Sequence, residues 1–89
     1  MFDTKQFEKI NPQYFNIIML SEHDVTVQSR NTEHYWYLHN TDYPSEGNCV
    51  IFHKYKAPHP YHLYGRAETL LQAVRSIMRH DEWQINARK

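Results

Sequence analysis

The sequence predicts an α+β domain with an N-terminal helical segment, a four-stranded antiparallel β-meander and a C-terminal helix packed on one sheet face. Apolar and polar residues alternate between about residues 24 and 64, which is the period of a strand with one buried face. The connections there are too short for crossover helices, so neighbouring strands must be antiparallel. From about residue 66 the apolar spacing becomes helical. The 89 residues, 1–89, are expected to form one small domain.

The first expected element is a short helix over about residues 4–10. Asp3 occupies the position of an N-cap residue, and Gln6 follows three residues later, which is the spacing of a capping box. Phe2 and Phe7 have the spacing of a hydrophobic staple, which fixes how the chain enters a helix. These local features together predict the start of this helix.

Residues 12–20 are expected to form a second helix, with a strand as the open alternative. Asn11 can act as N-cap, and Pro12 suits the first helical position. Ile10 and Phe15 again have the spacing of a staple. However, the apolar residues of this segment surround the whole helical wheel, and a buried strand would show the same composition.

Four strands are expected within DVTVQSR, HYWYLHN, NCVIFHKYK and YHLYG, because these segments are rich in β-branched and aromatic residues. The intervening NT, TDYPSEG and APHP have the composition of turns. The C-terminal helix is expected over about residues 66–80. Its apolar face consists of Ala67, Leu70, Leu71, Val74, Ile77 and Met78. The tail after residue 80 is expected to be irregular, with Trp83 packed against the domain.

Antiparallel hairpins with short turns assign the strand side chains to two faces. We place Val27 opposite Trp36 and Trp36 opposite Phe52, and we close the last hairpin with Lys56 opposite Tyr61. The expected core face then contains Val25, Val27, Trp36, Leu38, Val50, Phe52 and Leu63. The second face is rich in rings and is the candidate binding face. Its candidate residues are Arg30, Tyr35, Tyr37, His39, His53, Tyr55, His62 and Tyr64.

Rings on a sheet face suit two kinds of role. Bases of single-stranded nucleic acid stack on Tyr and His, and neighbouring Arg or Lys side chains contact the phosphates. Cross-strand ring pairs also stabilise a sheet, and such a face can lie under the N-terminal segment or in a homodimer interface. The sequence therefore favours a non-catalytic binding domain whose partner is single-stranded nucleic acid or a second copy of the chain.

Charge and cysteine content exclude several classes of protein. The formal net charge of zero argues against bulk duplex DNA as a partner, although residues 1–50 carry −4 and residues 51–89 carry +4. The single cysteine excludes an intramolecular disulfide framework. No secretory signal is recognisable, and no apolar run approaches the roughly 18 residues of a membrane span. We therefore expect a cytoplasmic protein without a membrane partner.

The cysteine and several histidines are of residue types that bind zinc. Cys49 and His53 are four residues apart in one expected strand, about 13 Å, which is too far for ligand bonds of about 2.0–2.3 Å. His53, His59 and His62 could meet across a hairpin, but packed or solvated histidines are more common. No motif for a catalytic nucleophile is present. No metal site, cofactor or catalytic residue is therefore assigned from the residues themselves.

The segments NTEHYWYLH and NCVIFHKYKAP resemble parts of the HicA-type mRNA interferase toxins, which share the helix, three-strand, helix topology of double-stranded-RNA-binding domains. The resemblance covers about residues 24–80. It implies a small RNA-acting enzyme in which His34 has the catalytic role, and this is the alternative function. Thr32 and Glu33 stand where the family has Gly-Ser, a fourth strand is required, and the lysine-rich helix start of the family is missing.

Overall fold

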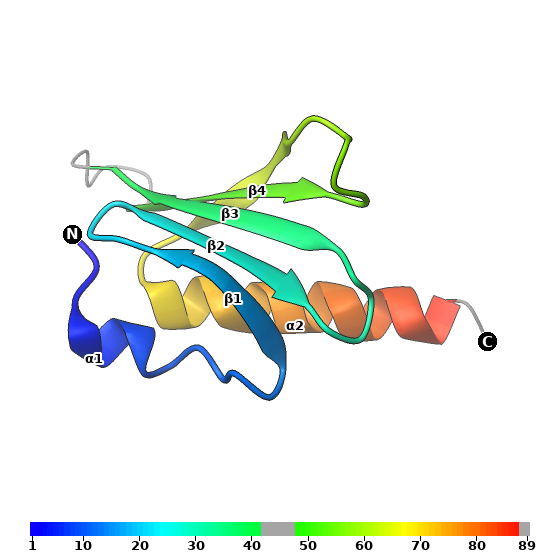
Figure 1. Ribbon diagram of the computed structural model, residues 1–89, viewed down its shortest axis with the longest axis horizontal. Helices are drawn as coiled ribbons and strands as arrows, with labels where there is room; N and C mark the ends of the chain where they lie inside the picture. The colour runs from blue at the N-terminus through cyan, green and yellow to red at the C-terminus, as the bar shows by residue number, and fades with distance from the viewer. Residues whose placement is uncertain (42–47, 88–89) are drawn as a thin grey trace.

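The computed structural model describes residues 1–41 and 48–87. It confirms the α+β class, with five strands in an antiparallel meander and one long helix against the sheet (Figure 1). The elements are α1 (Thr4–Phe7), β1 (Phe15–Leu20), β2 (Asp24–Ser29), β3 (Tyr35–Asn40), β4 (Cys49–Lys54), β5 (His62–Ala67) and α2 (Leu70–Ala87). Among these residues, neither helix combines the length and hydropathy that a membrane crossing requires.

The capping box predicted for the first helix is present. The Asp3 side chain accepts a hydrogen bond from the Gln6 backbone N–H at 2.9 Å, and the Gln6 side chain accepts one from the Asp3 N–H at 3.0 Å. The rings of Phe2 and Phe7 pack 6.4 Å apart. The helix nevertheless spans only Thr4–Phe7, whereas residues 4–10 were expected to be helical.

The prediction of a helix over residues 12–20 is wrong. The alternative, a strand, is present as β1. The capping residue Asn11 closes a single turn, in which its carbonyl accepts hydrogen bonds from the N–H groups of Tyr14 and Phe15. The chain then continues as β1, which pairs with β2 as an edge strand. Phe15 is fully buried and Ile17 partly buried on the side of α2, so the apolar run serves a strand with one inward face.

The register of the central hairpins differs from the expected one after β3. Val27 lies opposite Trp36, as predicted, but Trp36 lies opposite His53 instead of Phe52. This shift of one residue turns Cys49, Ile51 and His53 towards α2 and turns Val50, Phe52 and Lys54 to the opposite face. The last hairpin is shifted as well, and a bulge near Ile51 separates its two registers.

The shift changes which residues form the core. Trp36 and Leu38 are fully buried, as expected, and Ile51 takes the place expected for Phe52. Phe52 is half-buried on the other face, and Leu63 is 62% exposed. The expected turn over residues 41–47 lies almost wholly outside the described residues.

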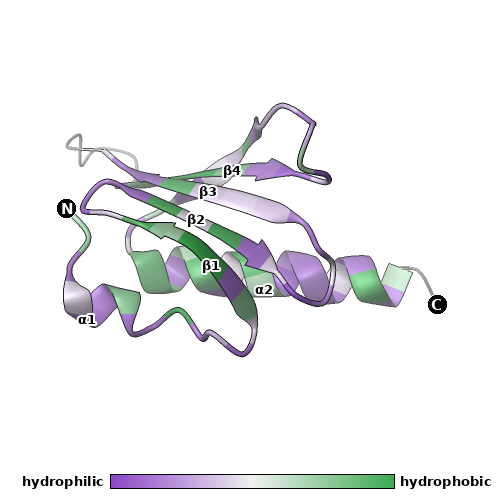
Figure 2. Cartoon of the chain, in the orientation of Figure 1, coloured by the Kyte–Doolittle hydropathy of each residue, from purple (hydrophilic) through white to green (hydrophobic). Residues whose placement is uncertain are grey.

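The long helix begins later and extends further than predicted. It runs to Ala87, so the tail expected to be irregular is helical, and Trp83 is 64% exposed instead of packed down. Hydrophobic residues concentrate in β1 and in the first half of α2 (Figure 2). The second half of α2 contacts polar residues of the sheet and its turns, because Asp81 bonds to Ser29 and Thr32 and His80 packs beside His53.

A buried carboxylate fixes this second half of α2 to the sheet. Asp81 is fully buried and accepts hydrogen bonds from the hydroxyls of Tyr14 (2.8 Å), Ser29 (2.6 Å) and Thr32 (3.0 Å). The Trp36 indole N–H also donates to the Ser29 hydroxyl at 3.1 Å. The carboxylate thus joins α2 to residues before β1, at the end of β2 and in the β2–β3 turn.

Candidate functional site

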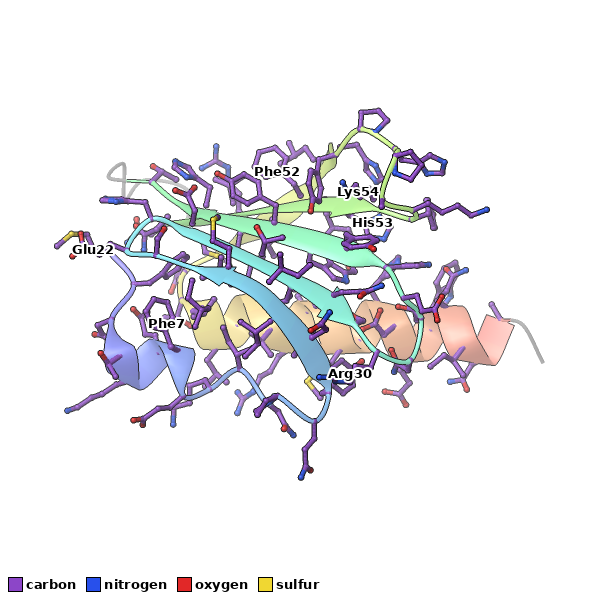
Figure 3. The ribbon with its side chains drawn as sticks, in the orientation of Figure 1. Phe7, Glu22, Arg30, Phe52, His53 and Lys54 are labelled. Atoms are coloured by element: carbon purple, nitrogen blue, oxygen red, sulfur yellow. The ribbon has the colours of Figure 1, made fainter. Side chains whose placement is uncertain are left out.

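Four histidines gather on the α2 side of the sheet, and we call them the histidine cluster: His34, His53, His62 and His80. His34 precedes β3, His53 lies near the end of β4 (Figure 3), and His80 is on α2 beside Asp81. His53 Nε2 lies 3.0 Å from His34 Nδ1, and His53 Nδ1 lies 3.3 Å from His62 Nε2. One nitrogen from each of His34, His53 and His80 lies within 4.8 Å of the others.

Aromatic side chains surround the histidine cluster. The Trp36 ring centroid is 4.3 Å from that of His53, and the Tyr55 centroid is 4.7 Å from that of His34. Tyr64 lies 5.3 Å from His80. These rings remove water from the imidazoles, and the desolvation disfavours their charged forms.

Two members of the cluster have lowered pKa values. Burial, followed by repulsion from His34, His80 and His62, lowers the pKa of His53 to about 4 from its ordinary 6.5. Burial also lowers the pKa of His80, although the nearby Asp81 carboxylate acts in the opposite direction. Both imidazoles are therefore neutral at pH 7, and each has one ring nitrogen with a free lone pair.

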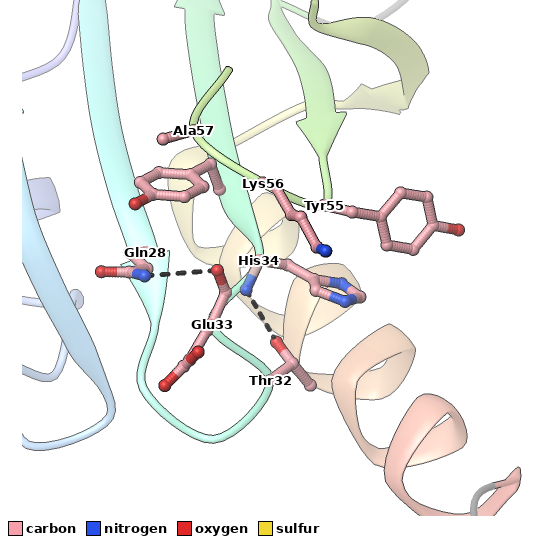
Figure 4. A pocket seen from close by; sticks show the side chains of 8 residues that line it. Gln28, Thr32, Glu33, His34, Tyr55, Lys56 and Ala57 are labelled. Carbon is pink, nitrogen blue, oxygen red and sulfur yellow. Dashed lines mark hydrogen bonds between the residues drawn. The ribbon is translucent and has the colours of Figure 1, made fainter. Parts of the chain in front are cut away.

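A polar cavity of about 500 Å³ opens beside the histidine cluster, at the ends of β2, β3 and β4 (Figure 4). His34 and Tyr55 line it together with Lys56 and Glu33. Gln28 donates a side-chain hydrogen bond to the Glu33 carbonyl at 3.2 Å, and Glu33 has a positive φ of 65°. This tight turn after β2 is what presents His34 to the cavity and to His53.

A second group of rings, the ring cluster, lies on the face away from α2 and consists of Tyr35, Tyr37, Phe52 and Tyr61. The rings of Tyr37 and Phe52 stack 5.5 Å apart at 24°, and Tyr37 lies 6.0 Å from Tyr61. The Lys54 ammonium lies 4.4 Å from the Tyr61 ring centroid and 5.3 Å from that of Tyr35. A cation held over two rings is an arrangement that also accepts bases and phosphates.

One edge of the ring cluster is fixed by a carboxylate. Tyr37 donates its phenolic hydrogen to Asp24, whose carboxylate is also 3.0 Å from His39 Nδ1. These hydrogen bonds lower the pKa of Asp24. Desolvation and the neighbouring carboxylate raise the pKa of Tyr37 to about 12. Tyr37 is therefore a neutral, oriented ring at pH 7.

A basic cavity of about 290 Å³ follows the β5 edge next to α2, and we call it the arginine groove. Arg66, Arg75 and Arg79 line it. Arg66 belongs to β5, and its pairing with Val50 places it on the same face as Phe52. The groove thus adjoins the sheet face that bears the ring cluster.

The structure divides the predicted binding face into two parts. Tyr35, Tyr37 and His39 lie on the face away from α2, as predicted. The face assignment of the other rings is wrong, because the register shift and the bulge place these residues at the histidine cluster: His53, Tyr55, His62 and Tyr64. Arg30 lies apart from both, in the β2–β3 turn, where its Nε donates to the Pro12 carbonyl at 3.2 Å.

The zinc ligands considered from the sequence are also rearranged. Cys49 is buried, and its burial raises the pKa of its thiol to about 12; neither Cys49 nor His59 belongs to the metal-competent group. His80 was missed because helical spacing alone gives no sign that α2 carries it to β4. Comparisons with protein-family models, with curated proteins and with solved structures each found no match.

Proposed function

We propose that the protein is a small non-catalytic binding domain whose ring cluster takes single-stranded nucleic acid. The observation that carries the proposal is the Lys54 ammonium held over the rings of Tyr35 and Tyr61, on a sheet face that no described helix covers. Bases stack on such rings with about 1–3 kcal/mol each and without strong sequence preference. The domain therefore suits unpaired bases better than a closed duplex.

The arginine groove is the second observation that favours a nucleic acid as the partner of this face. A strand whose bases stack on Tyr37 and Phe52 can pass over the β5 edge, where Arg66 and Arg75 can contact its phosphates. Phosphate contacts release condensed counterions, so binding through this route has a strong salt dependence. The near balance of charge over the whole chain agrees with a short strand as ligand instead of a long duplex.

The test is a titration of short single-stranded RNA and DNA into labelled protein, followed by amide shifts in NMR. The shifts should cluster at Tyr35, Tyr37, Phe52 and Lys54, and the affinity should fall with added salt. Tyr35→Ala should weaken binding by roughly 1–3 kcal/mol. Trp83→Ala is the control, because it removes an exposed ring on α2, away from the ring cluster.

A second copy of the chain is the other occupant this face could take. Sedimentation would then show twice the monomer mass, and Leu63→Glu, at an exposed position on the same face, would restore the monomer. A protein that dimerises in this way, and whose ring-cluster amides do not respond to any oligonucleotide at low salt, would contradict the nucleic-acid proposal.

An RNA-acting enzyme remains the second candidate, because His34 lines the polar cavity beside Lys56 and contacts His53. An imidazole there could accept the proton of a ribose 2′-hydroxyl while its oxygen bonds to the adjacent phosphorus, the P–O5′ bond breaks and the released 5′-oxygen takes a proton from water. Cleavage of RNA, but not of DNA of the same sequence, and its loss in His34→Ala would favour this function. Binding without turnover would favour the non-catalytic one.

A further inference from the structure

We propose that His34, His53 and His80 bind one divalent transition-metal ion of the zinc class. The site lies on the α2 side of the sheet, away from the ring cluster, so this inference goes beyond the proposed function and does not depend on it. Three elements supply the ligands: the turn before β3, the end of β4 and the second half of α2.

The distances are close to those of a three-imidazole site. A tetrahedral zinc ion with Zn–N bonds of about 2.0–2.1 Å separates its nitrogen ligands by roughly 3.4 Å. In the protein one nitrogen of each ring lies within 4.8 Å of the others, and His34 Nδ1 is 3.0 Å from His53 Nε2. The remaining gap is at most about 1.4 Å for any pair, and the proposal requires rotations of the imidazole rings to close it.

The burial of the ligands also favours binding. Burial lowers the pKa of both His53 and His80, which disfavours the charged imidazolium forms that cannot bind a metal. His80 Nε2 is buried and has no hydrogen-bond partner among the described residues. A buried nitrogen in this state is costly, and coordination would give it a partner.

The neighbours of the three ligands have the roles expected around a metal. His53 Nδ1 lies 3.3 Å from His62 Nε2, so an Nδ1–H donated to His62 would leave His53 Nε2 free for the ion. Trp36, Tyr55 and Tyr64 pack around the imidazoles and limit the access of water. Three protein ligands leave a fourth position for water or a small anion.

The donor set also decides between metals. Among the described residues no carboxylate belongs to the group, and the Asp81 carboxylate beside His80 is engaged by the hydroxyls of Tyr14, Ser29 and Thr32. Three imidazoles suit Zn²⁺, Co²⁺, Ni²⁺ or Cu²⁺, whereas Mg²⁺ and Ca²⁺ require oxygen ligands. We therefore expect binding of Zn²⁺ and Co²⁺ and no response to Mg²⁺ or Ca²⁺.

The experiment uses the full chain without a histidine tag, stripped of metal with EDTA. Zn²⁺ is titrated by calorimetry, and Co²⁺ by the visible absorption bands of its low-symmetry complexes. We expect saturation at one ion per chain, together with shifts of the His34, His53 and His80 ring signals in NMR. His62→Gln should weaken Zn²⁺ binding by about 10–100-fold through the loss of an outer-shell partner, and His80→Gln should weaken it further.

Two further variants control for surface histidines and for folding. His23→Gln and His59→Gln change histidines outside the cluster and should leave the Zn²⁺ affinity unchanged. Because His53 is fully buried, the main test uses His80→Gln at a partly buried position, and the amide spectrum of this variant shows whether it is folded. The proposal is overturned if the wild type shows no saturable binding, or if folded His80→Gln binds Zn²⁺ like the wild type. Neither result would affect nucleic-acid binding at the ring cluster.

Discussion

At the scale of single residues, Asp81 does most to place the histidine cluster. The carboxylate has no exposed surface and accepts three hydroxyl hydrogen bonds, which together hold α2 against the end of β2 and the β2–β3 turn. Its chain neighbour His80 is thereby brought to His34 and His53. A buried carboxylate destabilises the protein unless hydrogen bonds satisfy it. Asp81 therefore favours the one position of α2 in which all three hydroxyls reach its carboxylate.

Replacement of Asp81 by Ala should therefore destabilise the protein strongly. The change leaves the hydroxyls of Ser29 and Thr32 buried without an acceptor, and we expect the free energy of unfolding to fall by at least about 3 kcal/mol. Urea denaturation followed by tryptophan fluorescence measures the loss. Glu82→Ala is the control, since this exposed neighbour should change stability by no more than about 0.5 kcal/mol. Equal stability of the two variants would contradict the role of the carboxylate.

At the scale of elements, the sequence predicts the fold class, the β2–β3 register and the start of α1 correctly. It fails at β4, because Cys49–Phe52 is apolar at every position and fits either face. The β2–β3 hairpin had polar residues at alternate positions and a short turn, which together exclude a slip. The histidine cluster could not be foreseen either, because it depends on the β4 register and on where α2 carries His80.

The two registers make opposite predictions for a pair of aliphatic residues. In the structure Ile51 is 1% exposed and Leu63 is 62% exposed, whereas the expected register places Leu63 in the core. Ile51→Ala should therefore cost about 2–5 kcal/mol, as for other large core residues. Leu63→Ala should cost no more than about 0.5 kcal/mol. Chemical denaturation of both variants decides between the registers, and the reverse order of the two losses would restore the expected one.

At the scale of the whole molecule, one sheet separates two candidate sites with different chemistry. Alternate residues of β4 point to the two sites. Phe52 and Lys54 lie on the face with the ring cluster, and His53 belongs to the histidine cluster. The histidine cluster brings together four side chains of the type that titrates just below neutral pH in an unfolded chain. Between pH 6.5 and pH 4, acid should therefore act on the stability of the domain through His53 and His80 on that side of the sheet.

Stability should fall as the pH is lowered from about 6.5 to 4. The unfolded chain protonates His53 near its ordinary pKa of 6.5, whereas the folded protein keeps it neutral down to a pKa of about 4. Since the unfolded state binds more protons in this window, the free energy of unfolding rises with pH. A difference of this size corresponds to a contribution on the order of 3 kcal/mol at neutral pH. The lowered pKa of His80 acts in the same direction.

Urea denaturation midpoints between pH 4 and pH 7.5 would measure this loss of stability. The solutions contain EDTA, so that bound metal does not affect the midpoints. The neighbours that face His53 are His34, His62 and His80, and their coulombic repulsion adds to the lowering of the His53 pKa. His53→Gln should flatten the dependence, because glutamine does not titrate, while His59→Gln in the exposed β4–β5 loop should keep the wild-type slope. If His53→Gln lost stability with acid as steeply as the wild type, the buried neutral imidazole could not be its source. Added Zn²⁺ should raise the midpoint most at neutral pH and least near pH 4, where protons compete for the same ring nitrogens.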